Sequence, residues 1–305
     1  MLKNHSLVSI DDVTDEDLEE VFRVAERMNS ALATGKKVSI MDNKIMATLF
    51  YEASTRTRLS FESAMNRLGG SVITVADTSA SSVSKGETLA DTVRMAASYS
   101  DVIVVRHPLE GAARLASQFS SRPIINAGDG SGQHPTQTIM DLFTIRKEAG
   151  GIDGKTIALV GDLRYGRTVH SLILALSRFD VDIVLVSPPS LRIPEHFLAR
   201  IPSSRNIRVE TDLDSVISTS DVFYVTRIQK ERFTDQNEYK SLIGTYSLDL
   251  DDVARMKKGS IIMHPLPRID EIKPEVDFTD HAKYFRQAAY GVPVRMALIS
   301  LILEA

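Results

Sequence analysis

Short apolar runs rich in β-branched residues alternate along this chain with segments of helical periodicity. Eight runs have the composition of buried strands: 44–50, 71–75, 101–105, 123–125, 155–160, 182–186, 222–225 and 260–263. The clearest helical patterns lie at 14–32, 61–68, 89–97, 136–149 and 294–302. Because helices that alternate with strands act as crossovers, the pattern predicts parallel α/β sheets.

The strand candidates form two sets, separated by a helical pattern at 135–150. At roughly 100–200 residues per domain, a chain of 305 residues accommodates about two domains. We therefore predict an α/β protein with two doubly wound parallel-sheet domains joined by interdomain helices. The first comprises 1–134 plus 288–305, because the last helix has no following strand and is expected to pack back on it. The second comprises 135–287, with 135–150 as the interdomain helix.

Composition and charge exclude several classes of protein. The chain has no cysteine, so it forms no disulfide, thiol nucleophile, zinc knuckle or iron–sulfur cluster, which fits a reducing cytoplasm. Its 36 Lys and Arg against 40 Asp and Glu give a net charge of −4, whereas nucleic-acid binders need a basic face. Neither a signal peptide nor an apolar run of ~18–20 residues is found. We expect a cytoplasmic protein with no nucleic-acid or membrane partner.

A turn rich in hydroxyls and arginines, Ser54–Arg58, follows the first strand candidate and precedes a helix. Free N–H groups at a helix N-terminus, together with hydroxyls and guanidinium groups, suit a phosphate. The alternative is that Ser54 or Thr55 only caps the helix. The arginines would then be solvated, or paired with Glu52 and Glu62.

Two further segments with cationic or imidazole groups follow strand candidates. Arg106 comes directly after the run 101–105, and His134 precedes the interdomain helix. Since the carboxyl ends of parallel strands meet at one edge of a sheet, we expect both to converge on the Ser54–Arg58 turn. Taken singly, Arg106 is as well explained by a surface ion pair, and His134 by a turn.

The segment Gly161–Arg167 follows the strand candidate 155–160. It lacks the G-x-G-x-x-G spacing, and the next strand candidate ends without an acidic residue to hold a ribose, so a nicotinamide cofactor is disfavoured. Arg167 and Arg227 instead suit carboxylate recognition, because a guanidinium matches a carboxylate bidentately. The alternative for each is an exposed arginine that binds no ligand.

Two loops complete the set of candidates. Lys85 lies between a strand and a helix in the Ser- and Gly-containing segment 81–87, where functional groups are common; it could equally be a solvated lysine near Glu87. In His264–Pro267, two prolines remove N–H donors and leave backbone carbonyls to accept hydrogen bonds. By itself this second segment is also explained as a rigid turn.

Seven segments of this chain occur in the same order as in the catalytic chains of the aspartate carbamoyltransferase family, and the resemblance covers nearly the whole length of this chain. They are Ser54–Arg58, Lys85–Thr88, Arg106–Pro108, His134–Gln137, Gly161–Leu163 with Arg167, Thr226–Gln229 and His264–Pro267. The related ornithine enzymes have H-C-L-P where this chain has His264–Pro267. That difference, together with Arg167 and Arg227, favours aspartate.

The resemblance implies transfer of the carbamoyl group of carbamoyl phosphate to the amine of L-aspartate, in de novo pyrimidine biosynthesis, with no metal or organic cofactor. The implied carbamoyl-phosphate site comprises Ser54, Thr55, Arg56, Thr57, Ser81, Arg106, His134, Gln137, Pro265, Leu266 and Pro267. The implied aspartate site comprises Lys85, Arg167, Arg227 and Gln229. The implied catalytic groups are Arg56, Thr57, Lys85, Arg106 and His134.

Several roles within these sets are also implied by the resemblance. Thr57, Arg106 and His134 would donate hydrogen bonds to the carbamoyl oxygen. Gln137 and the carbonyls of Pro265 and Leu266 would accept from the carbamoyl amide, with a cis peptide bond after Leu266. The acceptor of the amine proton stays open between His134 and the departing phosphate.

The resemblance also implies a homotrimer in which Ser81 and Lys85 reach a neighbouring chain's site. Related catalytic chains assemble with zinc-bearing regulatory chains, although nothing local in this sequence demands such a partner. Two alternatives remain. An ornithine or other amine carbamoyltransferase would be expected to carry the H-C-L-P pattern, and a catalytically silent assembly homologue would be expected to have lost Arg56, Lys85, Arg106 or His134.

Overall fold

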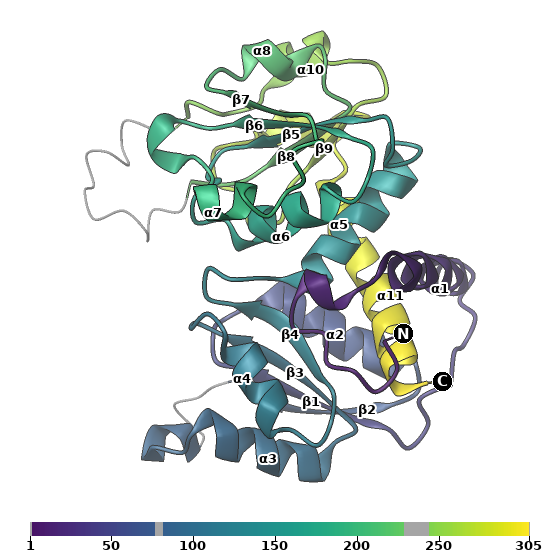
Figure 1. The fold of residues 1–305 in the computed structure, drawn as a ribbon. Helices are drawn as coiled ribbons and strands as arrows, with labels where there is room; N and C mark the ends of the chain where they lie inside the picture. Colours follow the sequence, from purple (N-terminus) through teal and green to yellow (C-terminus); the bar gives the residue numbers. More distant parts are fainter. Residues whose placement is uncertain (1, 77–81, 229–243, 305) are drawn as a thin grey trace. The chain divides into compact units, whose positions relative to one another are not determined.

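The computed structural model describes residues 2–76, 82–228 and 244–304 (Figure 1). Contacts divide the chain into two compact units. The first unit comprises Met1–Met140 with Ala289–Ala305, and the second comprises Asp141–Ala288. The domain limits expected from the sequence, 1–134 with 288–305 and 135–287, stay a prediction.

The first unit contains a four-stranded parallel sheet in the order β2-β1-β3-β4. Its strands are β1 (Ile45–Phe50), β2 (Ser71–Val75), β3 (Val102–His107) and β4 (Ile124–Asp129). Its helices are α1 (Asp15–Ala33), α2 (Thr55–Arg67), α3 (Leu89–Tyr99) and α4 (Ala112–Phe119). Helices α3 and α4 lie on one face of this sheet and α2 on the other (Figure 1). This doubly wound arrangement follows from right-handed crossovers that leave β1 in one direction and β3 in the other.

The second unit contains a five-stranded parallel sheet in the order β7-β6-β5-β8-β9. Its strands are β5 (Thr156–Val160), β6 (Asp182–Val186), β7 (Ile207–Glu210), β8 (Val222–Val225) and β9 (Ile261–Met263). Its helices are α6 (Arg167–Leu176), α7 (Glu195–Leu198), α8 (Asp214–Ile217) and α10 (Leu250–Arg255). Two helices, α5 (Pro135–Glu148) and α11 (Tyr284–Leu303), contain the points at which the chain passes from one unit to the other.

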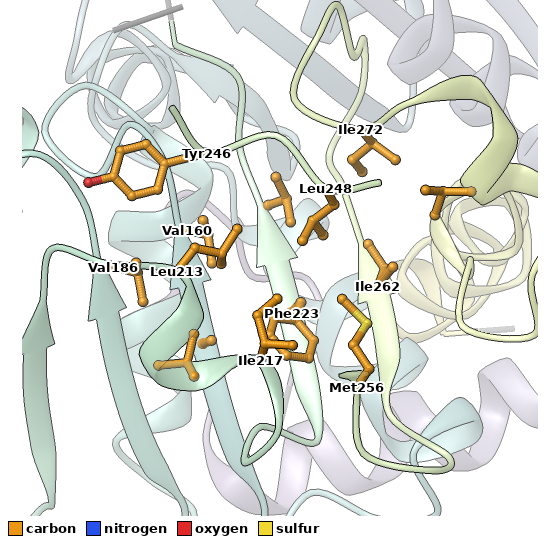
Figure 2. Close-up of a cluster of buried hydrophobic side chains, with 14 of the residues drawn as sticks. Val160, Val186, Leu213, Ile217, Phe223, Tyr246, Leu248, Met256, Ile262 and Ile272 are labelled. Carbon is orange, nitrogen blue, oxygen red and sulfur yellow. The ribbon is translucent and has the colours of Figure 1, made fainter. Parts of the chain in front are cut away.

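Each sheet has its own hydrophobic core. Figure 2 shows one core of the second unit, where side chains of β5, β6, β8 and β9 pack against those of α8 and α10. Phe223 and Ile262 are fully buried there. In the first unit, Ala47, Ile103 and Ile124 contribute to a second cluster beneath α3 and α4. Full burial of a large aliphatic or aromatic side chain contributes ~1.5–3 kcal/mol, so these cores hold the strand ends in place.

The predicted class, two parallel-sheet α/β domains, is confirmed, and every strand candidate in the sequence forms a strand. Thr14 caps α1, because its hydroxyl accepts from the Asp17 N–H at 3.1 Å. Strand β7 is missing from the prediction: it has four residues, two of them charged, and lies half-exposed at the edge of its sheet. In the described ranges, no helix combines the length and apolar character needed to cross a membrane.

Candidate active site

The candidate residues of the first unit lie at one edge of its sheet. Strands β1 and β3 are neighbours, and the crossovers that follow them run in opposite directions. Ligands bind in α/β sheets at such a reversal, outside the carboxyl ends of the strands. The Ser54–Arg58 turn follows β1. Arg106 is the residue before the last in β3, where it pairs in register with Phe50. The two predicted cationic segments therefore meet where this fold places its ligands.

The Ser54–Arg58 turn does not cap its helix through the Ser54 side chain. Ser54 occupies the N-cap position of α2, but within the described chain its hydroxyl makes no capping hydrogen bond. No ion pair links Arg56 to any described residue, and desolvation lowers the pKa of its guanidinium from the ordinary value. Arginine stays protonated at neutral pH even so. The alternative of a simple cap with paired arginines holds only for Arg58, whose Nε lies 3.7 Å from Glu62.

Arg106 connects three segments at this edge. It is only 9% exposed; its guanidinium lies 3.2 Å from the Glu52 carboxylate and donates to the carbonyl of Ala127 at 3.1 Å. Glu52 follows β1 and Ala127 lies in β4, so Arg106 ties the ends of all three strands together. A buried guanidinium held on two sides keeps a defined orientation, as recognition of an oxyanion requires.

His134 and Gln137 are brought to the start of α5, after β4. His134 is 4% exposed, and its Nδ1 lies 3.5 Å from the Thr136 hydroxyl, at the limit of a hydrogen bond. Its carbonyl accepts from the Gln137 N–H at 3.0 Å, which begins the helix. Gln137 and Thr57 are also buried. His134 therefore follows the carboxyl end of β4, the neighbour of β3. Its convergence on the Ser54–Arg58 turn stays a prediction.

The second unit also has candidate residues after two neighbouring strands. Strands β5 and β8 are neighbours at the point where its strand order reverses. Arg167 begins α6 after β5, and Arg227 follows β8; both are half-buried. The close approach of the two segments depends on Gly161, which has φ +108° and would place an added Cβ 2.3 Å from the carbonyl oxygen of Thr226. Only glycine fits there, so the two arginines follow segments that pack directly on each other.

The His264–Pro267 segment follows β9 and turns sharply. The peptide bond from Leu266 to Pro267 is cis, as predicted, and Leu266 has φ +53°. His264 is 2% exposed, and its Nδ1 accepts from the Leu266 N–H at 2.7 Å. Because that N–H can only donate, the imidazole proton lies on Nε2, which donates to Glu271 Oε1 at 2.6 Å. The other oxygen of Glu271 accepts from two backbone N–H groups, of Ile269 and Asp270, at 3.1 Å each.

This carboxylate makes a testable prediction about acid stability. Burial by itself raises the pKa of Glu271, but the hydrogen bonds from His264 and from the backbone outweigh it, and the pKa lies below the ordinary 4.5. A carboxylate whose pKa is lower in the folded state stabilises the native state at pH values above its unfolded-state pKa. This stabilisation is lost as the pH falls through the folded-state pKa. We expect the thermal midpoint of the wild type to fall more steeply below pH 4.5 than that of Glu271→Gln. Parallel pH profiles would contradict this assignment.

The remaining candidates are placed less fully. Lys85 ends a short 3-10 helix, Ser82–Lys85, and is exposed. Glu87 accepts from the Thr92 hydroxyl at 2.9 Å, and no ion pair joins it to Lys85 in the part of the chain that the structure describes. Ser81 and Gln229 lie outside the described residues. Across residues 2–76, 82–228 and 244–304, no three His, Asp or Glu side chains are grouped as metal ligands would be.

Three residues around the candidate site were not identified from the sequence: Glu271, Gln287 and Asp141. Gln287 accepts from the His264 N–H at 2.8 Å and donates to Asp141 at 2.7 Å. Their separation along the chain hides this contact, and no local pattern marks it. Glu271 lies seven residues after His264, but a carboxylate in a loop gives no indication that it is buried.

Comparison with known proteins identifies the class. Residues 5–147 match the model of the aspartate/ornithine carbamoyltransferase carbamoyl-P binding domain, and residues 153–302 match that of the Asp/Orn binding domain. The chain belongs to the aspartate/ornithine carbamoyltransferase family.

Relatives of the chain within that family are aspartate carbamoyltransferases. The aspartate carbamoyltransferase catalytic subunit of Thermoplasma volcanium is 68% identical over 303 residues, which cover 99% of each chain. The catalytic subunit of M. jannaschii aspartate transcarbamoylase has a TM-score of 0.90 at 52% identity and covers 98% of this chain and 97% of that one. The Trypanosoma cruzi aspartate transcarbamoylase in complex with carbamoyl phosphate and aspartate has a TM-score of 0.95 at 42% identity, covering 99% and 98%.

Proposed function

We propose that this chain transfers the carbamoyl group of carbamoyl phosphate to the amine of L-aspartate, giving N-carbamoyl-L-aspartate and phosphate. One observation carries the proposal: each of the two sheets has a pair of arginines at the point where its strand order reverses. Arg56 and Arg106 serve the first sheet, and Arg167 and Arg227 the second. A phosphate and a dicarboxylate are the substrates that two separate cationic sites would take.

The first unit holds carbamoyl phosphate. Its phosphate binds to the N–H groups at the start of α2, to the hydroxyls of Ser54, Thr55 and Thr57, and to Arg56. The uncapped N-terminus of α2 supports this role, because it leaves donors and the positive end of the helix dipole for an anion. Ser81 contributes to the same site.

Carbamoyl transfer proceeds by addition and elimination at the carbamoyl carbon. The aspartate amine forms a bond to this carbon, negative charge develops on the carbamoyl oxygen, and the bond to the phosphate oxygen then breaks. Donors from Thr57, Arg106 and His134 stabilise that oxyanion. Gln137 and the carbonyls of Pro265 and Leu266 accept from the carbamoyl amide. The amine proton leaves to the departing phosphate or to His134.

The second unit holds L-aspartate. Arg167, Arg227 and Gln229 bind its two carboxylates, with Lys85 assisting, and a guanidinium fork supplies two parallel hydrogen bonds to each carboxylate. The His264–Pro267 segment supports aspartate over ornithine, because the ornithine enzymes resemble H-C-L-P there.

The assembly and setting are part of the same proposal. The chain forms a cytoplasmic homotrimer in which Ser81 and Lys85 act in the neighbouring chain's site, and it serves the first committed step toward pyrimidines. A regulatory chain with bound zinc is a further candidate partner. No organic cofactor or metal takes part.

Steady-state assays of the purified chain test the activity. With carbamoyl phosphate and L-aspartate, L-ornithine or putrescine in parallel, we expect turnover with aspartate alone. Turnover with ornithine would show that Arg167 and Arg227 are misassigned. No turnover with any amine would favour the assembly homologue, or a missing partner chain, over the enzyme.

A further inference from the structure

The carbonyls of Pro265 and Leu266 raise a question that the proposed function leaves open. A backbone carbonyl carries no side-chain identity, so its direction depends entirely on the groups that fix the local backbone. In the proposed reaction these two carbonyls recognise the carbamoyl amide. Side chains that hold this turn would therefore decide whether an acyl phosphate with an amide is distinguished from inorganic phosphate, and the inference rests on that proposed role.

The turn adopts a conformation that its own sequence does not favour. Leu266 has φ +53°, in the left-handed region that non-glycine residues rarely enter. Such a conformation persists where the surrounding structure over-determines it. The Leu266 N–H donates to His264 Nδ1 at 2.7 Å, which is a direct hold on the residue in question.

The imidazole is itself held at its other nitrogen. His264 Nε2 donates to Glu271 Oε1 at 2.6 Å, and Glu271 Oε2 accepts from the N–H groups of Ile269 and Asp270. The carboxylate therefore joins the beginning and the end of the 264–270 turn. It also fixes the tautomer, because a carboxylate accepts a hydrogen bond from Nε2–H and leaves Nδ1 as the acceptor that Leu266 needs.

The backbone of His264 is fixed independently. Its N–H donates to Gln287 Oε1 at 2.8 Å, and Gln287 Nε2 donates to Asp141 Oδ1 at 2.7 Å. The second oxygen of Asp141 accepts from the Tyr224 hydroxyl at 2.8 Å. All four side chains of this network, His264, Gln287, Asp141 and Tyr224, are buried. Fully satisfied buried networks of this kind specify one conformation.

We propose that His264 and Glu271 are positioning residues for carbamoyl recognition: Glu271 selects the Nε2–H tautomer of His264, and His264 Nδ1 then holds the Leu266 backbone so that its carbonyl and that of Pro265 meet the carbamoyl amide. Neither side chain contacts the substrate in this scheme.

A matched pair of substitutions separates the two ring nitrogens. In His264→Asn, the amide lies where Nδ1 was, so it retains an acceptor for Leu266 and loses the donor to Glu271. In His264→Gln, the amide lies where Nε2 was, so it retains the donor and loses the acceptor. Both variants lose one buried hydrogen bond, and a purely structural role would affect them alike.

The readout is the ratio of two dissociation constants, for carbamoyl phosphate and for inorganic phosphate, because only the first ligand has an amide. We expect His264→Gln to weaken the binding of carbamoyl phosphate about tenfold and to leave the binding of inorganic phosphate unchanged. A tenfold change corresponds to the loss of about one hydrogen bond. Its kcat would fall by about 10- to 100-fold, as expected when a reacting group is misplaced. His264→Asn would retain a ratio within about threefold of the wild type.

The control is His281→Gln. His281 lies beside Ser260 at the opposite end of β9, and its Nδ1 contacts the Ser260 carbonyl at 2.8 Å. This variant loses a histidine Nδ1 contact to the residue that precedes β9 and should leave the ratio unchanged. Equal ratios for His264→Asn and His264→Gln, with activity falling only in proportion to the thermal midpoint, would overturn the inference.

A second variant keeps the test decisive if His264→Gln does not fold. In Glu271→Gln, one amide group cannot accept both from His264 Nε2 and from the two backbone N–H groups, so His264 is driven to the other tautomer. The binding of carbamoyl phosphate should weaken about tenfold. An unchanged ratio of the dissociation constants for carbamoyl phosphate and inorganic phosphate would overturn the inference. Failure of the proposed function is distinguishable, because the wild type itself would then not carbamoylate L-aspartate.

Discussion

Arg106→Ala is expected to lower the kcat of aspartate carbamoylation by roughly 10²–10³-fold, the usual cost of one oxyanion donor. Arg106 is the buried guanidinium at the end of β3, held by Glu52 and by the carbonyl of Ala127. Such a donor is oriented before the substrate arrives, so its contribution is largest when charge develops on the carbamoyl oxygen. The measurement is steady-state kinetics at saturating aspartate, with phosphate affinity measured separately.

The matched control for this variant is Arg94→Ala. Arg94 is an exposed arginine of α3 that pairs with Asp91 at 3.2 Å, and its loss should leave kcat unchanged. Circular dichroism at rising temperature shows whether Arg106→Ala is folded at the assay temperature. A folded Arg106→Ala chain with kcat within about threefold of the wild type would remove Arg106 from the reaction.

Mixing two inactive variants is expected to restore activity. If Lys85 acts in a neighbouring chain's site, a site made from a Lys85→Ala chain and supplied by an Arg56→Ala neighbour contains both groups. Random reassembly of equal amounts into cyclic trimers makes about a quarter of the sites complete. Turnover should rise from near zero for either variant alone to about a quarter of the wild-type rate.

The chain offers a strict control for the mixing experiment. Arg56 lies in the first turn of α2, after β1, and Arg106 lies near the end of the neighbouring strand β3. Both belong to the first unit, so Arg56→Ala and Arg106→Ala damage the site of the chain that carries them. Hybrids of these two variants contain no complete site and should stay inactive. Equal recovery in both mixtures, or none in either, would show that Lys85 does not act across chains.

Much of the architecture could be predicted, because the buried strands are short β-branched runs whose character does not depend on distant partners. Strand β7 could not, since at the edge of its sheet it carries charged residues and buries little. Arg106 and Arg227 were predicted at the carboxyl ends of buried strands, and Arg106 is one of the last two residues of β3 while Arg227 follows β8. In a parallel sheet those ends lie at one edge.

Other features of the site depend on contacts that the sequence does not record. Whether the Ser54 hydroxyl caps α2 is decided by its side-chain orientation, and either outcome suits the same residues. The partnership of His264 with Gln287 spans 23 positions of the chain and joins a loop to a helix. The protonation of His264 follows from the Leu266 N–H, which becomes visible only when the turn is folded.

The two separate cores give the protein a modular route to new acceptors. The Ser54–Arg58 turn and Arg106 depend on one sheet, while Arg167 and Arg227 depend on another with its own packing. Changes in the loops after β5 and β8 therefore need not disturb α2, the helix proposed to bind the phosphate. A library restricted to those two loops would search for different amine substrates with the carbamoyl donor machinery held constant. The Gly161 contact with Thr226 marks where such a library must stop, because a side chain there would force the two loops apart.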